Sequence, residues 1–72
     1  MNTAIIGLGV IGKVHAEVLF DQKENVVALC DTDLSKAQLV KDKYFNNAKI
    51  YSSYEEMLSS EKIDVVHICT PH

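Results

Sequence analysis

The part of the sequence that most constrains the fold is the stretch "AIIGLGVIGKVHAEVL" at residues 4–19. Within it, Gly7, Gly9 and Gly12 stand in a G-x-G-x-x-G pattern. An apolar run precedes the pattern and apolar residues at helical spacing follow it, which predicts a strand, a tight turn and a helix in succession. Two interpretations fit such a turn: a loop that binds a nucleotide, or a turn that needs glycine and binds nothing.

Apolar runs predict four strands along the chain. The first occupies residues 2–6, and the others occupy residues 25–30, 48–51 and 63–70, the last of which is ended by Pro71. Unbroken apolar runs of this length are typical of strands that are buried on both faces of a parallel sheet.

Three helical patterns separate these strands. The first helix is expected from Val10 to about Phe20, and a second lies within residues 31–45 with Asp33 as its N-cap. A third begins after Ser53, which forms a capping box with Glu56. The apolar positions that predict the first helix are Val10, Ile11, Val14, Val18 and Leu19. The resulting order, β-α-β-α-β-α-β with right-handed crossovers, predicts an α/β fold: part of a Rossmann-type open parallel sheet with strand order 3-2-1-4.

This strand order also predicts the state of the two cysteines. Cys30 and Cys69 lie near the ends of the second and fourth strands, on either side of the first. Two strand spacings of about 4.8 Å each exceed the limit of about 7 Å between the α-carbons of a disulfide. We expect two free thiols.

The surroundings of the glycines favour the nucleotide-binding interpretation. The pattern joins a predicted strand to a predicted helix, and Asp31 ends the next strand nineteen residues after Gly12. Dinucleotide-binding folds place an acidic residue at about 20 residues. All three glycines of the chain lie in this pattern, and no other turn is expected to need one.

Each residue of the motif has an expected task. Gly7 allows the tight turn after the strand, Gly9 lets a pyrophosphate approach the backbone, and Gly12 lets the helix pack close to the strand. The N–H groups of Val10 and Ile11, at the helix N-terminus, are expected to bind the phosphates.

The acidic residue predicts which dinucleotide is bound. Asp31 is expected to accept hydrogen bonds from the adenosine ribose hydroxyls and to repel a 2′-phosphate. Neither Thr32 nor Asp33 is the arginine that accommodates that phosphate. NAD is therefore favoured over NADP. Lys36 is the one candidate that would favour NADP, although we expect it to be a solvated helix residue.

The end of the fourth strand is the second expected part of the site, because ligands bind where the strand order reverses. Thr70, Pro71 and His72 are expected on the nicotinamide side. His15 is expected to be a packing or surface residue, and His67, inside the last strand, a structural one. No residues have the spacing of a metal site or of a Ser-His-acid arrangement, so no metal is expected.

Composition narrows the classes of partner. The chain has 72 residues and a net charge of −3, which predicts one domain without a general attraction to nucleic acid or anionic lipid. No apolar run approaches the ~20 residues of a membrane helix, and the N-terminus does not resemble a signal peptide. We expect a cytoplasmic protein.

Together these features resemble the N-terminal part of the Gfo/Idh/MocA oxidoreductases, relatives of glucose–fructose oxidoreductase and inositol dehydrogenase. The stretches "AIIGLGVIGKVHAEVL", "VVALCDTD", "YSSYEEML" and "IDVVHICTPH" follow the order and spacing of that family across essentially the whole chain. The resemblance implies an NAD(P)-binding Rossmann domain, followed by a substrate domain. It also implies hydride transfer between the nicotinamide cofactor and a sugar, cyclitol or related alcohol.

The resemblance also implies which residues contact the cofactor, and it assigns no catalytic residue to this chain. By position, the contacting residues would be Leu8, Val10, Ile11, Asp31, Thr32, Thr70, Pro71 and His72. The family's E-K-P lysine and its later substrate histidine have no counterpart in this sequence, so no catalytic residue is assigned. We expect residues 1–72 to be the N-terminal part of a dinucleotide-binding domain, with the substrate domain absent from this chain.

Two other functions remain open. One is a non-catalytic NAD-binding sensor or regulatory module, since this fold also serves in regulators. The other is a truncated, ligand-free remnant that is stabilised by self-association. Self-association is expected through the unpaired apolar edge at residues 63–69 or through uncovered faces of the sheet.

Overall fold

A parallel sheet lies at the centre of the computed structural model, which describes residues 1–70. Its strands are β1 (Asn2–Ile6), β2 (Asn25–Cys30), β3 (Lys49–Tyr51) and β4 (Val65–Ile68), and the helices are α1 (Val10–Asp21), α2 (Leu34–Tyr44) and α3 (Tyr54–Ser60). The strand order is β3-β2-β1-β4. The predicted order and the Rossmann-type α/β fold are confirmed.

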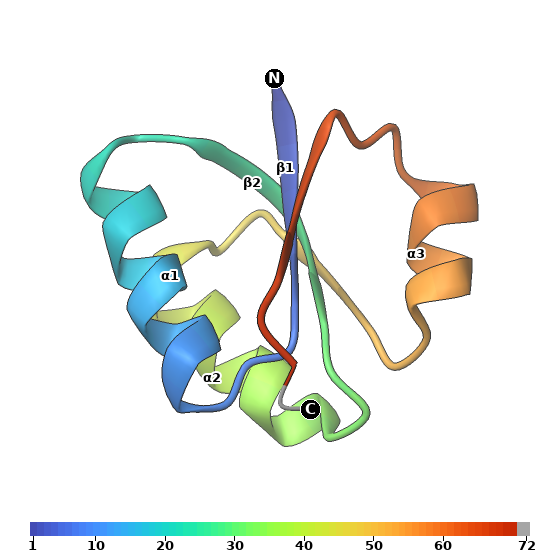
Figure 1. Ribbon diagram of the computed structural model, residues 1–72, viewed down its shortest axis with the longest axis horizontal. Coiled ribbons are helices and arrows are strands. Elements are labelled where there is room, and N and C mark those ends of the chain that lie inside the picture. The colour runs from blue at the N-terminus through green and yellow to red at the C-terminus, as the bar shows by residue number, and fades with distance from the viewer. Residues whose placement is uncertain (71–72) are drawn as a thin grey trace.

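The helices cover the two faces of the sheet unequally. Helices α1 and α2 lie on one face and α3 lies alone on the other (Figure 1). Because successive strand residues point to opposite faces, Ile5 and Leu29 pack under α1 and α2, whereas Ala4 and Ala28 pack against Met57 of α3. The larger core therefore lies under α1 and α2.

Backbone hydrogen bonds extend the sheet into the loops at its carboxyl edge. The Gly7 N–H donates to the Cys30 carbonyl at 2.8 Å, and the Cys69 N–H donates to the Ile6 carbonyl at 2.8 Å. On the far side, the Asp31 N–H donates to the Tyr51 carbonyl at 3.0 Å. The loops that follow β1, β2 and β4 are thus fixed beside one another, at the lower edge of the sheet in Figure 1.

Two strands are shorter than the sequence predicted. β3 lacks Ala48, whose N–H donates to the Phe45 carbonyl at 3.0 Å in the preceding turn. β4 covers only the inner part of the predicted residues 63–70, because its partner β1 pairs from Thr3 to Ile6 and then turns away at Gly7. The end of β4 is therefore set by the length of β1, its partner strand. The sequence of residues 63–70 alone does not show this limit.

The first helix forms where predicted, but its buried face is not the apolar stripe that predicted it. Most of the stripe is exposed: Val10, Ile11, Val14 and Val18. The buried positions of α1 are Gly12, Ala16 and Leu19. Small residues face the sheet because the helix packs close to it, which leaves the larger valines outside.

The predicted N-caps of the other two helices form. The Asp33 carboxylate accepts from the Ser35 N–H at 3.0 Å, and hydrogen bonds from the Ser35 hydroxyl and N–H lower the pKa of Asp33. The Ser53 hydroxyl oxygen accepts from the Glu56 N–H at 3.3 Å. Within residues 1–70 this bond is the only half of the capping box that forms.

Both cysteines are free thiols, as the strand order predicts. Cys30 ends β2 and Cys69 follows β4, so β1 lies between them.

One turn has a left-handed residue that is not glycine, a conformation that the sequence did not predict. Lys23 follows α1 with a φ of 58°. Its N–H donates to the Phe20 carbonyl and the Glu24 N–H donates to the Leu19 carbonyl, both at 3.0 Å. This pair of bonds is the Schellman ending of a helix, in which glycine is the usual left-handed residue.

Replacing this residue tests the assignment. Lys23→Gly is expected to stabilise the chain by about 0.5–1 kcal/mol, because the left-handed conformation costs most residues about 1–2 kcal/mol and the added chain entropy of glycine offsets only part of that. Urea unfolding measures the change. The control, Lys13→Gly inside α1, should destabilise by about 1 kcal/mol. A Lys23→Gly chain that is less stable than the parent would contradict the assigned turn.

Candidate functional site

The glycine loop begins with a conformation and a close contact that both require glycine. Gly7 has a φ of +90°, a backbone conformation that residues with a β-carbon rarely adopt. A β-carbon placed there would lie 2.8 Å from the Thr70 nitrogen and 2.9 Å from the Cys69 carbonyl carbon. The loop therefore turns directly against the chain that leaves β4.

Gly12 closes the same loop from its other end. A β-carbon on Gly12 would collide with the carbonyl oxygen of Gly7 and lie 2.8 Å from the Gly7 carbonyl carbon. The sequence predicted that this glycine lets the helix approach the strand. The structure makes the contact specific: the first turn of α1 packs on the backbone of the loop itself.

Gly9 differs from the other two glycines. Its φ of −73° is open to any residue, and a β-carbon built there would meet no described atom within 4 Å. Neither the backbone conformation nor the packing of residues 1–70 requires glycine at this position. The space in front of Gly9 opens to the outside of the molecule.

The N-terminus of α1 points its backbone donors toward this space. The first bond of the helix runs from the Lys13 N–H to the Gly9 carbonyl at 3.0 Å. The N–H groups of Val10, Ile11 and Gly12 precede that bond, so they have no partner within the helix. Such donors, together with the helix dipole, favour an anion in front of the loop.

Asp31 makes two contacts that the sequence did not predict. Its Oδ2 accepts from the Leu8 N–H at 2.8 Å, and its Oδ1 accepts from the Asp33 N–H at 2.8 Å. Leu8 is fully buried and its N–H is bound to Asp31, so this predicted contact residue presents no exposed side chain to the cleft. The carboxylate thus joins the loop after β1 to the turn after β2.

A cleft of about 360 Å³ runs along the loop at the carboxyl edge of the sheet. Five residues predicted for the site line it: Gly7, Gly9, Asp31, Thr32 and Thr70. The other predicted residues do not belong to its lining: Leu8, Val10, Ile11 and Gly12. Pro71 and His72 lie outside the described residues.

The cleft also has walls that the sequence analysis missed or set aside. Ser52 lines it from the turn after β3, Tyr54 from the first residue of α3, and Lys36 from the first part of α2. A signal for Ser52 was present, since it follows the third strand at the edge where Asp31 follows the second. Lys36 is an exposed residue of α2, as expected, and it also borders the cleft, which helical spacing alone does not predict.

The cysteines near the cleft are poor nucleophiles. Burial raises the pKa of Cys30, and the neighbouring Asp31 charge raises it further; burial also raises the pKa of Cys69. Both side chains therefore remain thiols at neutral pH, and the thiolate is the reactive form.

The two histidines pack against each other away from the cleft. The rings of His15 on α1 and His67 on β4 have centroids 5.7 Å apart in an edge-to-face arrangement. His15 is exposed on α1 and His67 is half-buried in β4, which agrees with a packing or surface position for His15 and a structural one for His67. Within residues 1–70, no group of three or more acidic, histidine or cysteine side chains gathers as metal ligands.

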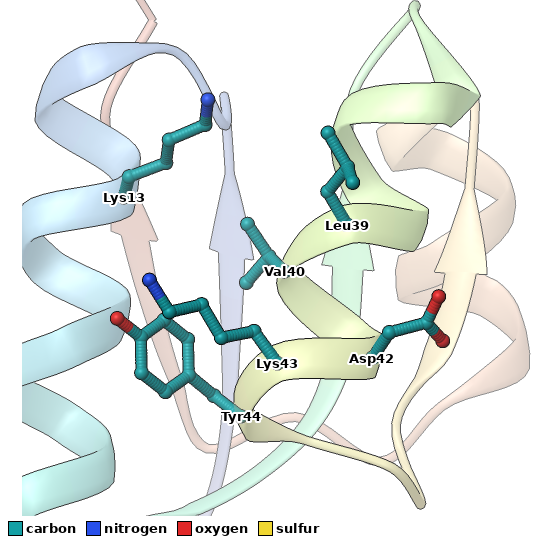
Figure 2. Close-up of a pocket in the computed structure, with 6 residues that line it drawn as sticks. All are labelled: Lys13, Leu39, Val40, Asp42, Lys43 and Tyr44. Atoms are coloured by element: carbon teal, nitrogen blue, oxygen red, sulfur yellow. The ribbon is translucent and has the colours of Figure 1, made fainter.

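A second cavity, of about 480 Å³, lies between α1 and α2 (Figure 2). Its lining consists of Lys13, Leu39, Val40, Asp42, Lys43 and Tyr44. The Lys43 ammonium lies 5.3 Å from the centre of the Tyr44 ring, a cation–π contact. No residue of the glycine motif borders this cavity, so the cleft at the loop remains the candidate site.

None of the helices described is long and apolar enough to cross a lipid bilayer.

Comparisons with known proteins agree with this geometry. Over residues 1–72 the chain matches the family model "Oxidoreductase family, NAD-binding Rossmann fold". It is 40% identical over 74 aligned residues to D-glucoside 3-dehydrogenase of Escherichia coli (strain K12), a match that covers 100% of this chain and 21% of that protein.

Solved structures give the same result. The myo-inositol 2-dehydrogenase from Lactobacillus plantarum matches with a TM-score of 0.88 and 33% identity, over 99% of this chain and 21% of that one. The myo-inositol dehydrogenase from Lactobacillus casei, solved in complex with NAD(H) and myo-inositol, matches with a TM-score of 0.88 and 28% identity, over 97% of this chain and 21% of that one. The chain thus spans about 21% of the length of these relatives.

The different surroundings of the glycines lead to a test of the fold. Gly12→Ala is expected to destabilise the chain by about 3 kcal/mol or more, because its β-carbon meets backbone that cannot move aside. Gly9→Ala is expected to change the free energy of unfolding by less than about 0.5 kcal/mol. Urea unfolding followed by circular dichroism measures both. Equal losses for the two variants would contradict the open space in front of Gly9.

Proposed function

Since this chain belongs to the Gfo/Idh/MocA oxidoreductase family, we propose that it binds NAD in the cleft beside the glycine loop. The bound cofactor would exchange a hydride with a sugar, cyclitol or related alcohol. The names of the relatives support this proposal, since a D-glucoside 3-dehydrogenase and two myo-inositol dehydrogenases match the chain.

The observation that carries the proposal is the open space at Gly9. The fold itself explains Gly7 and Gly12 through contacts that a β-carbon would break. No contact within residues 1–70 requires glycine at position 9, where a β-carbon would meet none of the described atoms within 4 Å. A pyrophosphate that approaches the backbone supplies a reason for glycine there. This argues against the interpretation that the turn needs glycine and binds nothing.

The arrangement of the cleft suggests which of its residues would bind each part of the cofactor. The pyrophosphate would lie over Gly9 and accept hydrogen bonds from the Val10 and Ile11 N–H groups. The adenosine ribose would lie at Asp31, beside Thr32, because the cleft continues in that direction. We place the nicotinamide toward Thr70, and extend that side to Pro71 and His72 by their position in the chain.

Asp31 also supports a preference for NAD over NADP. A carboxylate accepts hydrogen bonds from ribose hydroxyls but repels a 2′-phosphate. Lys36 lines the same cleft, and among the described lining residues its ammonium is the one cationic group that would offset this repulsion. We propose that Asp31 decides the preference, because both of its oxygens are fixed by backbone donors.

We further propose that residues 1–72 are the N-terminal part of a dinucleotide-binding domain, and that a substrate domain outside this chain carries the catalytic residues. The 21% share of the relatives that the chain spans supports this division. The residues of the cleft would bind and orient the cofactor, which supplies the hydride chemistry when bound.

Calorimetric titration with NAD tests the proposal. The chain is expected to bind NAD with saturation and to bind NADP more weakly. Gly9→Ala should weaken NAD binding by at least about tenfold, or 1.4 kcal/mol, since the β-carbon of the alanine would occupy the space of the pyrophosphate. Ser60→Ala, at the end of α3, is the matched control and should bind as the parent does.

The outcomes separate the candidate functions. No heat of binding at millimolar NAD would contradict the proposal and favour the ligand-free remnant. NAD binding by this chain, together with a full-length protein that oxidises no sugar or cyclitol with NAD, would favour the sensor or regulatory module.

We also propose that the chain associates with itself through the edge of β4. This strand, Val65–Ile68, carries no charged residue, and Ile68 is 72% exposed. The opposite edge, β3, is protected because it has only 3 residues and begins with Lys49.

Sedimentation velocity tests this association. The chain is expected to form dimers or larger species as its concentration rises, and Ile68→Lys should lower their fraction severalfold because a charge at an edge opposes strand pairing. A parent chain that stays monomeric at high concentration would contradict the proposal.

A further inference from the structure

We propose that Asp31 is a positioning residue that holds the glycine loop in its ligand-binding shape before any ligand arrives. This inference rests on the proposed function of the cleft, and it assigns to Asp31 a task besides contact with the ribose. The two hydrogen bonds that carry it, from the Leu8 N–H and from the Asp33 N–H, are called the Asp31 bridge below.

The Asp31 bridge joins two segments that are far apart in sequence. Leu8 lies between Gly7 and Gly9 in the loop after β1, and its N–H lies 2.8 Å from Oδ2. The Asp33 N–H, 2.8 Å from Oδ1, belongs to the turn that starts α2. Each oxygen of one carboxylate therefore holds one of two loops that contribute walls to the cleft.

The chemistry of the bridge calls for a carboxylate rather than any acceptor. An ionised carboxylate has two acceptor oxygens, so both N–H groups find an acceptor. An asparagine has one oxygen, and its NH₂ would face the second N–H donor. Each carboxylate oxygen also has a second acceptor position, which leaves capacity for ribose hydroxyls.

The bridge fixes the part of the loop that faces the phosphates. The Leu8 side chain is fully buried and its N–H is held by Asp31, so Leu8 is held from both sides. Gly9 follows immediately and its carbonyl starts α1. A loop fixed in this way does not need to be ordered when a ligand binds, which lowers the entropy cost of binding.

Two roles for Asp31 predict opposite effects on a ligand that has no ribose. If Asp31 only contacts ribose, removing its negative charge should strengthen the binding of inorganic pyrophosphate, because a repulsion is lost. If Asp31 holds the loop, removing its carboxylate should weaken the binding of pyrophosphate, because the backbone donors of the loop are no longer held in place. The sign of the change therefore separates the two roles.

The experiment is a pyrophosphate titration of the parent chain, Asp31→Ala and Asp33→Ala, followed by amide NMR shifts. Asp33→Ala is the matched control, since it removes the same charge nearby and costs the α2 N-cap but leaves the backbone N–H of residue 33 in place. Asp31→Ala is expected to bind pyrophosphate at least about threefold more weakly than Asp33→Ala, the loss of a fraction of one charge-assisted hydrogen bond. Equal or tighter binding by Asp31→Ala would overturn the inference.

Hydrogen exchange without ligand is the second arm, and it decides the question even if pyrophosphate binds no variant or Asp31→Ala does not fold. In Asp31→Asn, the amide of Leu8 or of Asp33 is expected to exchange about tenfold faster, because one N–H loses its acceptor. Asp33→Ala should leave the Leu8 amide as protected as in the parent. Unchanged exchange at both amides in Asp31→Asn would overturn the Asp31 bridge. Since no cofactor is present, this result is independent of whether the chain binds NAD.

Discussion

The structure depends on one close contact, between the first turn of α1 and the carbonyl of Gly7. The contact exists only because Gly12 has no β-carbon, and it brings the N-terminus of α1 directly over the end of β1. Thr70 approaches Gly7 from the other side, where a β-carbon would lie 2.8 Å from the Thr70 nitrogen. The first turn of α1, the glycine loop and the chain that follows β4 are thereby packed around Gly7. The cleft lies beside this contact.

Much of this arrangement follows from the sequence because it depends on local pattern. Apolar runs separated by segments with helical spacing predict the strand order. The strand order in turn predicts that Cys30 and Cys69 are free thiols. The stripe of α1 shows where pattern is insufficient. Its valines predict a helix but remain largely exposed, because the distance between helix and sheet selects Gly12 and Ala16 for the buried face.

The candidate site was predictable in part for the same reason. The motif and the position of Asp31 place these residues together at one edge of the sheet. The hydrogen bond from the Leu8 N–H to Asp31 was not predictable, because it joins residues from separate loops whose geometry is set by the sheet. Lys36 and Tyr54 enter the cleft for a similar reason, since their place depends on where α2 and α3 begin. The left-handed Lys23 follows from no local signal, because glycine is the residue that marks such a turn.

The central claim is that the space in front of Gly9 receives the pyrophosphate of NAD. The most direct measurement is an amide NMR titration of the chain with NAD, with each shift change assigned to its residue. Saturable changes are expected at residues 9–12 and around Asp31, with none at the cavity between α1 and α2. Changes confined to that cavity, or no saturable change at residues 9–12 at millimolar NAD, would contradict it.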